Sequence, residues 1–291
     1  MMILDALKEA SGALLDAGVP DSRLDAELLL AHVLGTNRMA LLMNGSRRLS
    51  PAEQAVYDAL VHRRKQREPL QYILACQSFM GFDLYVDENV LIPRPETELL
   101  CEHAITWLKQ RKLPSPRVLD LCTGSGALAV AIAAMMPNAK VSAADISEKA
   151  LEVAKRNAAQ HKADIAFHQG DFLETVPGMR FDLIVCNPPY IPTAICNTLQ
   201  AEVLQEPRAA LDGGMDGLYF YRKLALEAPP HLSPGGALFC EVGYGQAEDV
   251  QSLFAPCFEK TDVLNDLSRI PRIVTALLPN SLPGGNNVRQ V

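Results

Sequence analysis

The residues best able to do chemistry form the tetrapeptide Asn187-Pro188-Pro189-Tyr190, which directly follows the apolar run at 181–186. Proline fixes its own φ and offers no backbone N–H, so the two prolines should hold the asparagine rigidly at the end of a strand. The side-chain oxygen of Asn187 and the carbonyl oxygen of Pro188 are then two acceptors for a planar –NH₂ group, and Tyr190 offers a flat surface for stacking. We therefore predict all four as catalytic and substrate-binding residues.

Two fixed acceptors suit the transfer of a methyl group to nitrogen. The lone pair of an amide or aromatic amine is delocalised, so such a nitrogen is a weak nucleophile unless it is oriented toward an electrophilic methyl. Positioning of this kind supplies effective molarities of ~10⁵–10⁸ M. The alternative interpretation is an Asn-Pro turn with no catalytic role.

A glycine-rich turn follows the predicted strand 117–121 and precedes a predicted helix. Glycine has no Cβ, so a nucleotide-like ligand can approach the backbone closely there. Asp145 ends the next predicted strand, where its carboxylate can accept both hydroxyls of a ribose. The spacing fits S-adenosylmethionine and also the loose dinucleotide pattern of NAD proteins, or a purely structural turn. The cofactor-binding candidates of the turn are Cys122, Thr123, Gly124, Ser125 and Gly126.

Asp171 and Phe172 follow the third predicted strand of this region. An aspartate can accept a hydrogen bond from an adenine amino group, and an aromatic ring can cover the face of the base. The alternative is a turn aspartate beside a core phenylalanine. We include both residues, with Asp145 and Asn187, among the cofactor-binding candidates.

Short apolar runs alternate with helical stretches around these residues, which predicts an α/β fold with a mostly parallel sheet. In that architecture ligands bind at the carboxyl ends of the strands. The predicted strands are 117–121, 139–144, 164–168, 181–186, 237–242, 261–264 and 272–277. The predicted helices are 95–109, 127–136, 147–161 and 217–232.

The first 75 residues have a different, helical pattern. Their clearest signal is at Ser50, which has Pro51 after it and Glu53 three residues on, as in a capping box. Residues 76–94 indicate a β-hairpin that links the two regions. The tail, 279–291, contains Pro-Gly-Gly-Asn-Asn and is expected to be disordered.

The charge balance makes nucleic acid an unfavoured partner. The chain has 27 Lys and Arg against 34 Asp and Glu, a formal charge of −7. Within 1–75 the two signs cancel, so the acidic excess belongs to the remainder. Because affinity for phosphate comes mostly from Lys and Arg, a protein loop is a better substrate for this chain than a bare phosphate backbone.

Cysteine and histidine spacing indicates neither a disulfide framework nor a metal site. The seven cysteines form no C-x-x-C pair, and the six histidines show no metal-binding spacing. A reducing cytoplasm is the expected location, with no metal and no membrane segment. The longest apolar run, 127–136, is half of the ~20 residues that a spanning helix needs.

With these residues in view, the chain resembles the class I S-adenosylmethionine-dependent methyltransferases. More closely it resembles the peptide chain release factor glutamine N5-methyltransferases, the PrmC or HemK family. The resemblance covers almost the whole chain, although Cys122 stands where many members carry glycine. Further matching segments are 91–98, 206–211, 241–246, 266–267 and 271–274. Within 91–98, Arg94, Glu96 and Thr97 either close over the site or cap the next helix.

The resemblance implies a seven-stranded Rossmann-like methyltransferase domain at 95–278, a hairpin linker at 76–94 and a helical substrate-recognition domain at 1–75. It implies S-adenosylmethionine as cofactor, with S-adenosylhomocysteine as product. The implied substrate is the glutamine of the Gly-Gly-Gln loop of class 1 release factors, methylated on its side-chain nitrogen to modulate translation termination. We expect a cytoplasmic monomer.

Four alternatives remain at this point. One is methylation of an exocyclic amine of a nucleic-acid base, which poses the same chemical problem as an amide. A second is methylation of a glutamine of ribosomal protein uL3. The third is a binding module without turnover, and the fourth is an NAD-dependent oxidoreductase, for which the sequence offers no evident hydride-transfer residue.

Overall fold

The computed structural model describes residues 1–279, in two compact units. The first unit contains residues 1–76 and, from much later in the chain, residues 199–205. The second contains residues 77–198 and the described chain from 206 onward. The tail predicted to be disordered lies, except for Pro279, outside the described residues.

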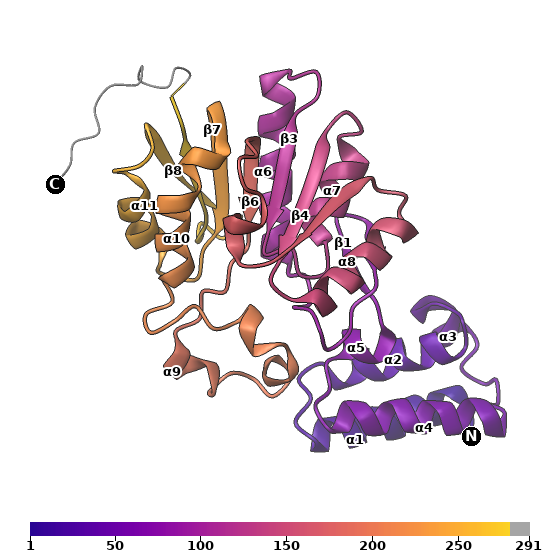
Figure 1. Ribbon diagram of the computed structural model, residues 1–291. Helices are drawn as coiled ribbons and strands as arrows, with labels where there is room; N and C mark the ends of the chain where they lie inside the picture. Colours follow the sequence, from indigo (N-terminus) through magenta and orange to yellow (C-terminus); the bar gives the residue numbers. More distant parts are fainter. Residues whose placement is uncertain (280–291) are drawn as a thin grey trace, which may run out of the picture. The chain divides into compact units, whose positions relative to one another are not determined.

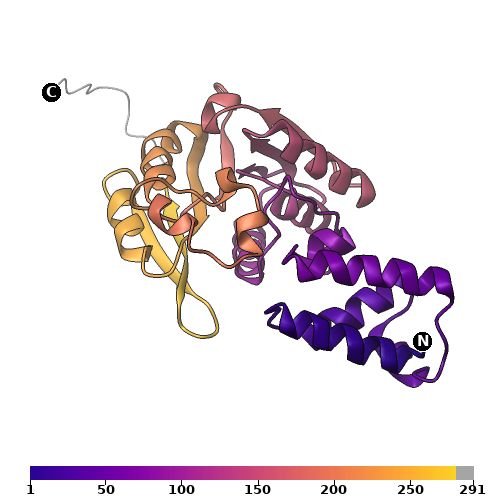
Figure 2. The same ribbon diagram turned by 90° about the horizontal axis from the view of Figure 1, so that it is seen from below.

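The first unit is built from helices (Figure 2), whose apolar side chains form a core between them. Leu14, Leu29, Leu30, Leu41 and Tyr57 are almost completely buried in that core. The helices are α1 (Ile3–Asp16), α2 (Ser22–Val33), α3 (Arg38–Met43), α4 (Pro51–Lys65) and α5 (Leu70–Leu74). No pattern in the sequence predicts that residues 199–205 join them.

The capping box predicted for α4 is present. The Ser50 hydroxyl accepts a hydrogen bond from the Glu53 N–H at 3.2 Å. The Glu53 carboxylate in turn accepts one from the Ser50 N–H at 2.8 Å, and Pro51 occupies the first helical position. These contacts satisfy N–H groups that a helix start leaves without intrahelical partners.

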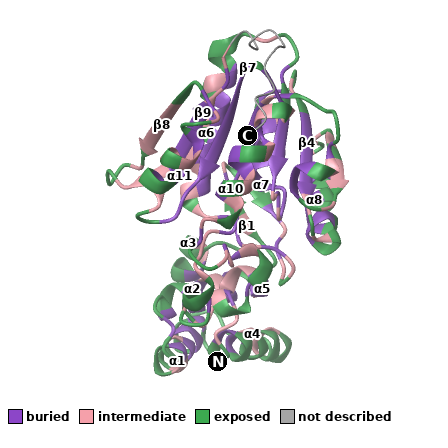
Figure 3. Ribbon diagram, turned by 60° about the vertical axis from the view of Figure 1, so that its left-hand side comes forward, coloured by how far each residue is buried: buried purple, intermediate pink, exposed green. Residues whose placement is uncertain are grey.

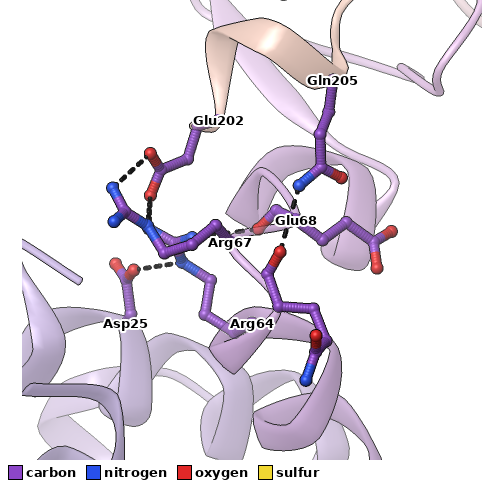
Figure 4. A network of polar contacts seen from close by, with 7 residues as sticks. Asp25, Arg64, Arg67, Glu68, Glu202 and Gln205 are labelled. Atoms are coloured by element: carbon purple, nitrogen blue, oxygen red, sulfur yellow. Dashed lines mark hydrogen bonds and ion pairs between the residues drawn. The ribbon is translucent and has the colours of Figure 1, made fainter. Parts of the chain in front are cut away.

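A partly buried ion network holds residues 199–205 in the helical unit (Figure 4). Arg64, only 5% exposed, donates to Asp25 and to Glu202, both at 2.8 Å. Arg67 donates to both oxygens of Glu202 at 2.7 and 2.6 Å. Burial alone would raise the pKa of Glu202, but the hydrogen bonds from Arg67 and Arg64 outweigh it and lower the pKa to about 2. Gln205 adds a bond to the Gln66 carbonyl.

The second unit begins with a short hairpin, β1 (Gln77–Phe79) and β2 (Phe82–Leu84). Its two-residue loop is Met80-Gly81, and both residues have positive φ, 51° and 82°. That conformation is typical of two-residue hairpin loops, whose twist matches the flanking strands. The predicted hairpin was longer, because the apolar residues at 85–92 form no strand.

A seven-stranded sheet is the centre of this unit and confirms the predicted fold class (Figure 1). The strand order is β5-β4-β3-β6-β7-β9-β8, with β9 antiparallel to both of its neighbours and the other pairs parallel. The strands are β3 (Arg117–Leu121), β4 (Lys140–Asp145), β5 (Ile165–Gln169), β6 (Phe181–Cys186), β7 (Leu232–Glu241), β8 (Lys260–Asn265) and β9 (Pro271–Leu277).

Helices cover both faces of the sheet, so its central strands are buried (Figure 3). One core cluster joins the sheet to α6 (Pro95–Arg111), α7 (Ala127–Met135) and α8 (Glu148–Gln160). The other joins the opposite face to α10 (Tyr219–Glu227) and α11 (Ala247–Phe254). A short helix, α9 (Thr193–Cys196), lies in the long loop after β6.

In the second unit, one predicted helix has different bounds in the structure and one helix was not predicted. The helix predicted at 217–232 ends at Glu227, since Pro229 and Pro230 cannot continue it and form a 3₁₀ turn instead. Strand β7 consequently starts at Leu232 rather than at 237. Helix α11 was not predicted at all, although its buried residues Ala247, Val250 and Phe254 have helical spacing. Its eight residues are fewer than the roughly 11–18 over which a helical period is usually recognised.

Candidate active site

The glycine-rich turn follows β3 and has three residues in the left-handed region. Cys122, Gly124 and Gly126 have φ of 60°, 53° and 81°. A Cβ added to Gly124 would meet no atom within 4 Å, so the space beside this backbone is open to a ligand. A Cβ on Gly126 would lie 3.0 Å from the Cβ of Ala154, so this glycine serves the packing of α7 on α8.

Asp145 at the end of β4 braces the turn. Its two oxygens accept hydrogen bonds from the Gly124 N–H and the Ser147 N–H, each at 2.9 Å. Burial raises the pKa of Asp145, against the effect of these backbone donors. A carboxylate has about four acceptor positions, so Asp145 keeps capacity for ligand hydroxyls.

Asp120 supports the same turn from inside the protein. Its Oδ2 accepts from the Thr123 hydroxyl at 2.6 Å and from the Ala129 N–H at 3.1 Å. Its Oδ1 has no hydrogen-bond partner among the described residues, and burial raises its pKa to about 7. Sequence reasoning missed Asp120, although a lone aspartate inside an apolar strand was a usable signal.

Asp171 and Phe172 follow β5 and differ in burial and in the contacts that they make. Phe172 is 5% exposed, has a φ of 54° and packs near Phe220. Asp171 is exposed and makes an ion pair with Lys223 at 3.1 Å, and the Lys223 ammonium also lies over the Phe172 ring. Asp171 is therefore already paired, although an exposed ion pair of this kind contributes little.

A cavity of about 470 Å³ opens at the carboxyl ends of β3, β4 and β6, within the size range of small-molecule sites. It brings together six of the nine predicted cofactor residues, from the loops after β3, β4, β5 and β6. These six are Cys122, Gly124, Asp145, Asp171, Phe172 and Asn187, whereas Thr123, Ser125 and Gly126 do not line the cavity. Of the other predicted catalytic residues, Pro189 lines it and Pro188 and Tyr190 do not. Sequence reasoning missed further lining residues at 89–91, 146–147, 207, 209–210, 212 and 219–220.

Asn187 follows β6, and its side chain is held from beneath. Its Nδ2 donates to the Thr97 hydroxyl at 3.0 Å, and Thr97 donates to Glu241 at 2.7 Å. The Tyr190 hydroxyl reaches the other Glu241 oxygen at 3.4 Å. Thr97 thus neither covers the site nor caps α6 through its side chain; it lies under the tetrapeptide.

The backbone of Tyr190 is enclosed by glycines and one glutamine. A Cβ on Gly213 would lie 2.7 Å from the Tyr190 Cα, and one on Gly217 would lie 2.3 Å from its carbonyl oxygen. Gln246 donates to that carbonyl at 3.0 Å and accepts from the Gly243 N–H at 3.0 Å. Segments 213–217 and 241–246 therefore set the position of the tetrapeptide.

Glu206 plays a similar structural role for 91–98. Only 5% exposed, it accepts from the Ile92 N–H at 3.0 Å and from the Arg94 guanidinium. Glu96 instead pairs with Arg272 on β9 at 3.4 Å. The segments singled out by resemblance are thus in contact with one another, although they are far apart in the sequence.

Known proteins match the chain over nearly its full length. Residues 5–74 match the family described as "PrmC N-terminal domain", and residues 96–217 match "Methyltransferase small domain". A release factor glutamine methyltransferase from Geobacter sulfurreducens is 46% identical over 266 residues, 89% of this chain and 92% of that protein. One from Koribacter versatilis is 40% identical and covers 97% of this chain and 100% of its own.

The chain belongs to the release factor glutamine methyltransferase family. A methyltransferase of known structure from Pyrococcus furiosus shares the fold, with a TM-score of 0.53 and 18% identity over 75% of this chain and 98% of that one. Membership confirms the resemblance drawn from the residues. Two of the segments that carried this resemblance, 91–98 and 241–246, contact the tetrapeptide through Thr97, Glu241 and Gln246.

For a member of this family, the described residues offer a cofactor site without a metal site. Residues 1–279 contain no group of three or more His, Cys, Asp or Glu that could hold a metal ion. No helix in that part of the chain is long and apolar enough to cross a membrane. The cavity instead combines an open glycine backbone, an acceptor carboxylate and aromatic walls, a set that fits S-adenosylmethionine.

Proposed function

We propose that this enzyme transfers a methyl group from S-adenosylmethionine to the side-chain nitrogen (N5) of the glutamine in the Gly-Gly-Gln motif of class 1 peptide chain release factors. The observation that carries the proposal is the position of Asn187, at the wall of the cofactor-sized cavity and directly after β6. The names of the relatives favour this function over a nucleic-acid amine or a glutamine of uL3. Such methylation would modulate translation termination.

Two parts of the site would hold the cofactor. Asp145 would accept the ribose hydroxyls while it fixes the turn through Gly124, and Phe172 would cover the base. Of the remaining candidates, Cys122 and Asp171 line the cavity, while Thr123, Ser125 and Gly126 maintain the turn. When bound, S-adenosylmethionine would supply an electrophilic methyl whose leaving group is a neutral thioether, so the leaving group needs no general acid. As the new N–C bond forms and the S–C bond breaks, the glutamine nitrogen would release one of its two protons to water.

The tetrapeptide would hold the glutamine. The Asn187 side-chain oxygen and the Pro188 carbonyl would accept the two amide hydrogens, which aims the nitrogen lone pair at the methyl. Pro189 and the enclosed backbone of Tyr190 keep these acceptors in place. Because the acceptors are fixed before the substrate arrives, catalysis here is mainly positioning.

The remaining assignments follow from the same proposal. Residues 1–75 would recognise the release factor, 76–94 would link the two regions, and 95–278 would carry the chemistry. The enzyme would act as a monomer in the cytoplasm. The neutral helical region and the acidic remainder favour a protein partner over a nucleic acid.

Mass spectrometry tests the substrate directly. Purified class 1 release factor is incubated with the enzyme and S-adenosylmethionine, then digested. We expect a gain of about 14 Da on the peptide that contains Gly-Gly-Gln, as for any single methylation. Methylation of added ribosomal RNA or of uL3, with the release factor unmodified, would contradict the proposal.

A further inference from the structure

Thr97 and Glu241 form a buried hydrogen-bonded chain beneath the tetrapeptide. Thr97 lies in the first turn of α6 and is 5% exposed; Glu241 ends β7 and is 2% exposed. The first hydrogen bond joins Asn187 Nδ2 to the Thr97 hydroxyl at 3.0 Å, and the second joins that hydroxyl to Glu241 Oε2 at 2.7 Å. Tyr190 approaches Glu241 Oε1 at 3.4 Å. Both ends of the tetrapeptide therefore depend on one carboxylate.

The direction of these hydrogen bonds follows from the chemistry of the groups. A threonine hydroxyl has a single hydrogen, and an ionised carboxylate can only accept. Thr97 must therefore donate to Glu241, which leaves its oxygen free only to accept from Asn187. The Asn187 group that faces Thr97 is consequently the NH₂ group, and the side-chain oxygen is the end left for a ligand.

The orientation matters because the two ends of an asparagine amide have almost the same shape but opposite hydrogen-bonding roles. A substrate amide nitrogen brings two hydrogens, so it needs acceptors. An Asn187 turned by 180° would present its own hydrogens to that nitrogen and repel it. The rigid prolines fix the backbone of the tetrapeptide, but they do not choose between these two side-chain orientations.

We propose that Thr97 and Glu241 are positioning residues that fix the polarity of the Asn187 amide, so that its oxygen faces the glutamine to be methylated. The inference rests on the proposed function, because it assigns a role within that same site. It accounts for a buried carboxylate next to a site whose reaction needs no acid.

The charge of Glu241 governs this polarity. Burial raises the pKa of the Glu241 carboxyl to about 7, and the negative charge of Glu96 on α6 also raises it. The hydrogen bond from Thr97 and the positive charge of Arg272 on β9 lower this pKa. Neutral groups complete its surroundings: Tyr190, and Tyr221 of α10, which donates to the Glu241 backbone carbonyl. A protonated Glu241 can donate to Thr97, and Thr97 can then donate to Asn187. Activity should therefore fall as the pH drops below about 7.

The first test compares Thr97→Val, which keeps the shape but removes the hydroxyl, with Thr97→Ser, which keeps the hydroxyl. We expect Thr97→Val to lower kcat by roughly tenfold or more while the cofactor Kd stays within about twofold. Thr97→Ser should keep most of the turnover. A Thr97→Val enzyme with wild-type kcat, or a Thr97→Ser enzyme as slow as Thr97→Val, would overturn the proposal.

The second test uses Glu241→Gln, whose side chain keeps an acceptor for Thr97 but does not titrate. We expect the loss of kcat below pH 7 to be present in the wild type and absent in Glu241→Gln. If kcat of the Glu241→Gln variant fell below pH 7 as it does in the wild type, the proposed role of Glu241 would be overturned. This test remains decisive if Thr97→Val does not fold.

A third measurement does not depend on the substrate. In protein labelled with ¹⁵N-asparagine, the side-chain NH₂ signal of Asn187, assigned by its loss in Asn187→Ala, should move with pH in the wild type but not in Glu241→Gln. A signal that is the same in both proteins would contradict the proposal. If the wild type failed to methylate a release factor, the proposed function would be wrong. The pH dependence of the Asn187 signal would still test whether Glu241 controls the orientation of the Asn187 amide.

Discussion

Asn187 is the side chain on which turnover should depend most. In Asn187→Ala the glutamine amide loses one of its two acceptors, so we expect kcat to fall by roughly 10²–10³-fold, as for other single positioned groups. Cofactor affinity should change little, because the glycine turn and Asp145 are untouched. The measurement is initial rate at saturating release factor together with calorimetric Kd. Asn138→Ala, at an exposed asparagine, is the control, and wild-type turnover in Asn187→Ala would refute the role.

Replacement of Asp145 should weaken the binding of S-adenosylmethionine, whereas replacement of Asn187 should lower kcat. Asp145→Ala removes the acceptor for the ribose and also the partner of the Gly124 and Ser147 N–H groups. Since a hydrogen bond to a charged group contributes about 1.5–3 kcal/mol, we expect roughly 10- to 100-fold weaker S-adenosylmethionine binding. Calorimetry measures the affinity, with Asp164→Ala at an exposed position as the control. If Asp145→Ala and Asp164→Ala bound S-adenosylmethionine with equal affinity, Asp145 would not be a cofactor-binding residue.

The residues proposed to contact cofactor and substrate could be singled out from the sequence, and most of them line the cavity, while the residues that support them could not be predicted. Asn187, Asp145 and Phe172 stand next to glycines, prolines or strand ends, where local patterns are strong. Thr97 and Glu241 act through contacts across 144 positions of sequence, and no local pattern encodes such a contact. Their segments were singled out only through resemblance, and the roles first considered for Thr97 did not include support of Asn187.

At the scale of elements, the position of the tetrapeptide depends on the loop at 213–217 as well as on β6. Gly213 does not have a positive φ, so alanine causes no backbone strain there. The added methyl group would instead lie 2.7–2.8 Å from backbone atoms of Tyr190 and Pro189. We expect Gly213→Ala to lower kcat by roughly tenfold or more and to destabilise the protein by about 1–3 kcal/mol. Kinetics and urea unfolding measure the two effects.

The control for that change is Gly12→Ala. Gly12 lies in α1, and a Cβ there would meet nothing within 4 Å. Alanine should stabilise the helix by up to about 1 kcal/mol and leave turnover unchanged. If Gly213→Ala behaved in the same way, the close approach of this loop to Tyr190 would have no functional consequence.

Elements with a strong period or a clear boundary signal were predicted well, as β3, β6 and α4 show. Their bounds depend on local features, such as the apolar runs of the two strands and the capping box of α4. Helix α10 was predicted too long because its apolar pattern continues across Pro229 and Pro230 into β7. Helices α3, α5 and α11 have five to eight residues each, and helices this short are not stable without tertiary packing.

At the scale of the molecule, the ion network around Glu202 should make stability depend on acid. The pKa of Glu202 is about 2 in the folded protein against an ordinary value of 4.5. Its contribution is therefore complete above about pH 5 and is lost as the pH falls toward 2. We expect Glu202→Gln to be less stable than the wild type by about 3 kcal/mol at pH 7, with the difference shrinking at low pH.

Urea unfolding at pH 7 and at pH 3 measures this difference. Glu9→Gln, at an exposed position of the same helical unit, should match the wild type at both values. If the Glu202→Gln protein were as stable as the wild type at pH 7, the ion pairs of Glu202 with Arg64 and Arg67 would make no net contribution to stability.

The excursion of residues 199–205 makes the helical unit discontinuous. The chain passes between the two units at 76–77, at 198–199 and again at 205–206. A chimera joined to a relative at a single point near residue 76 would therefore pair one parent's Arg64 and Arg67 with the other parent's 199–205 segment. Exchange of this domain, in the laboratory or by recombination, succeeds only when both pieces are inherited together or when the acidic partner is the same in both parents.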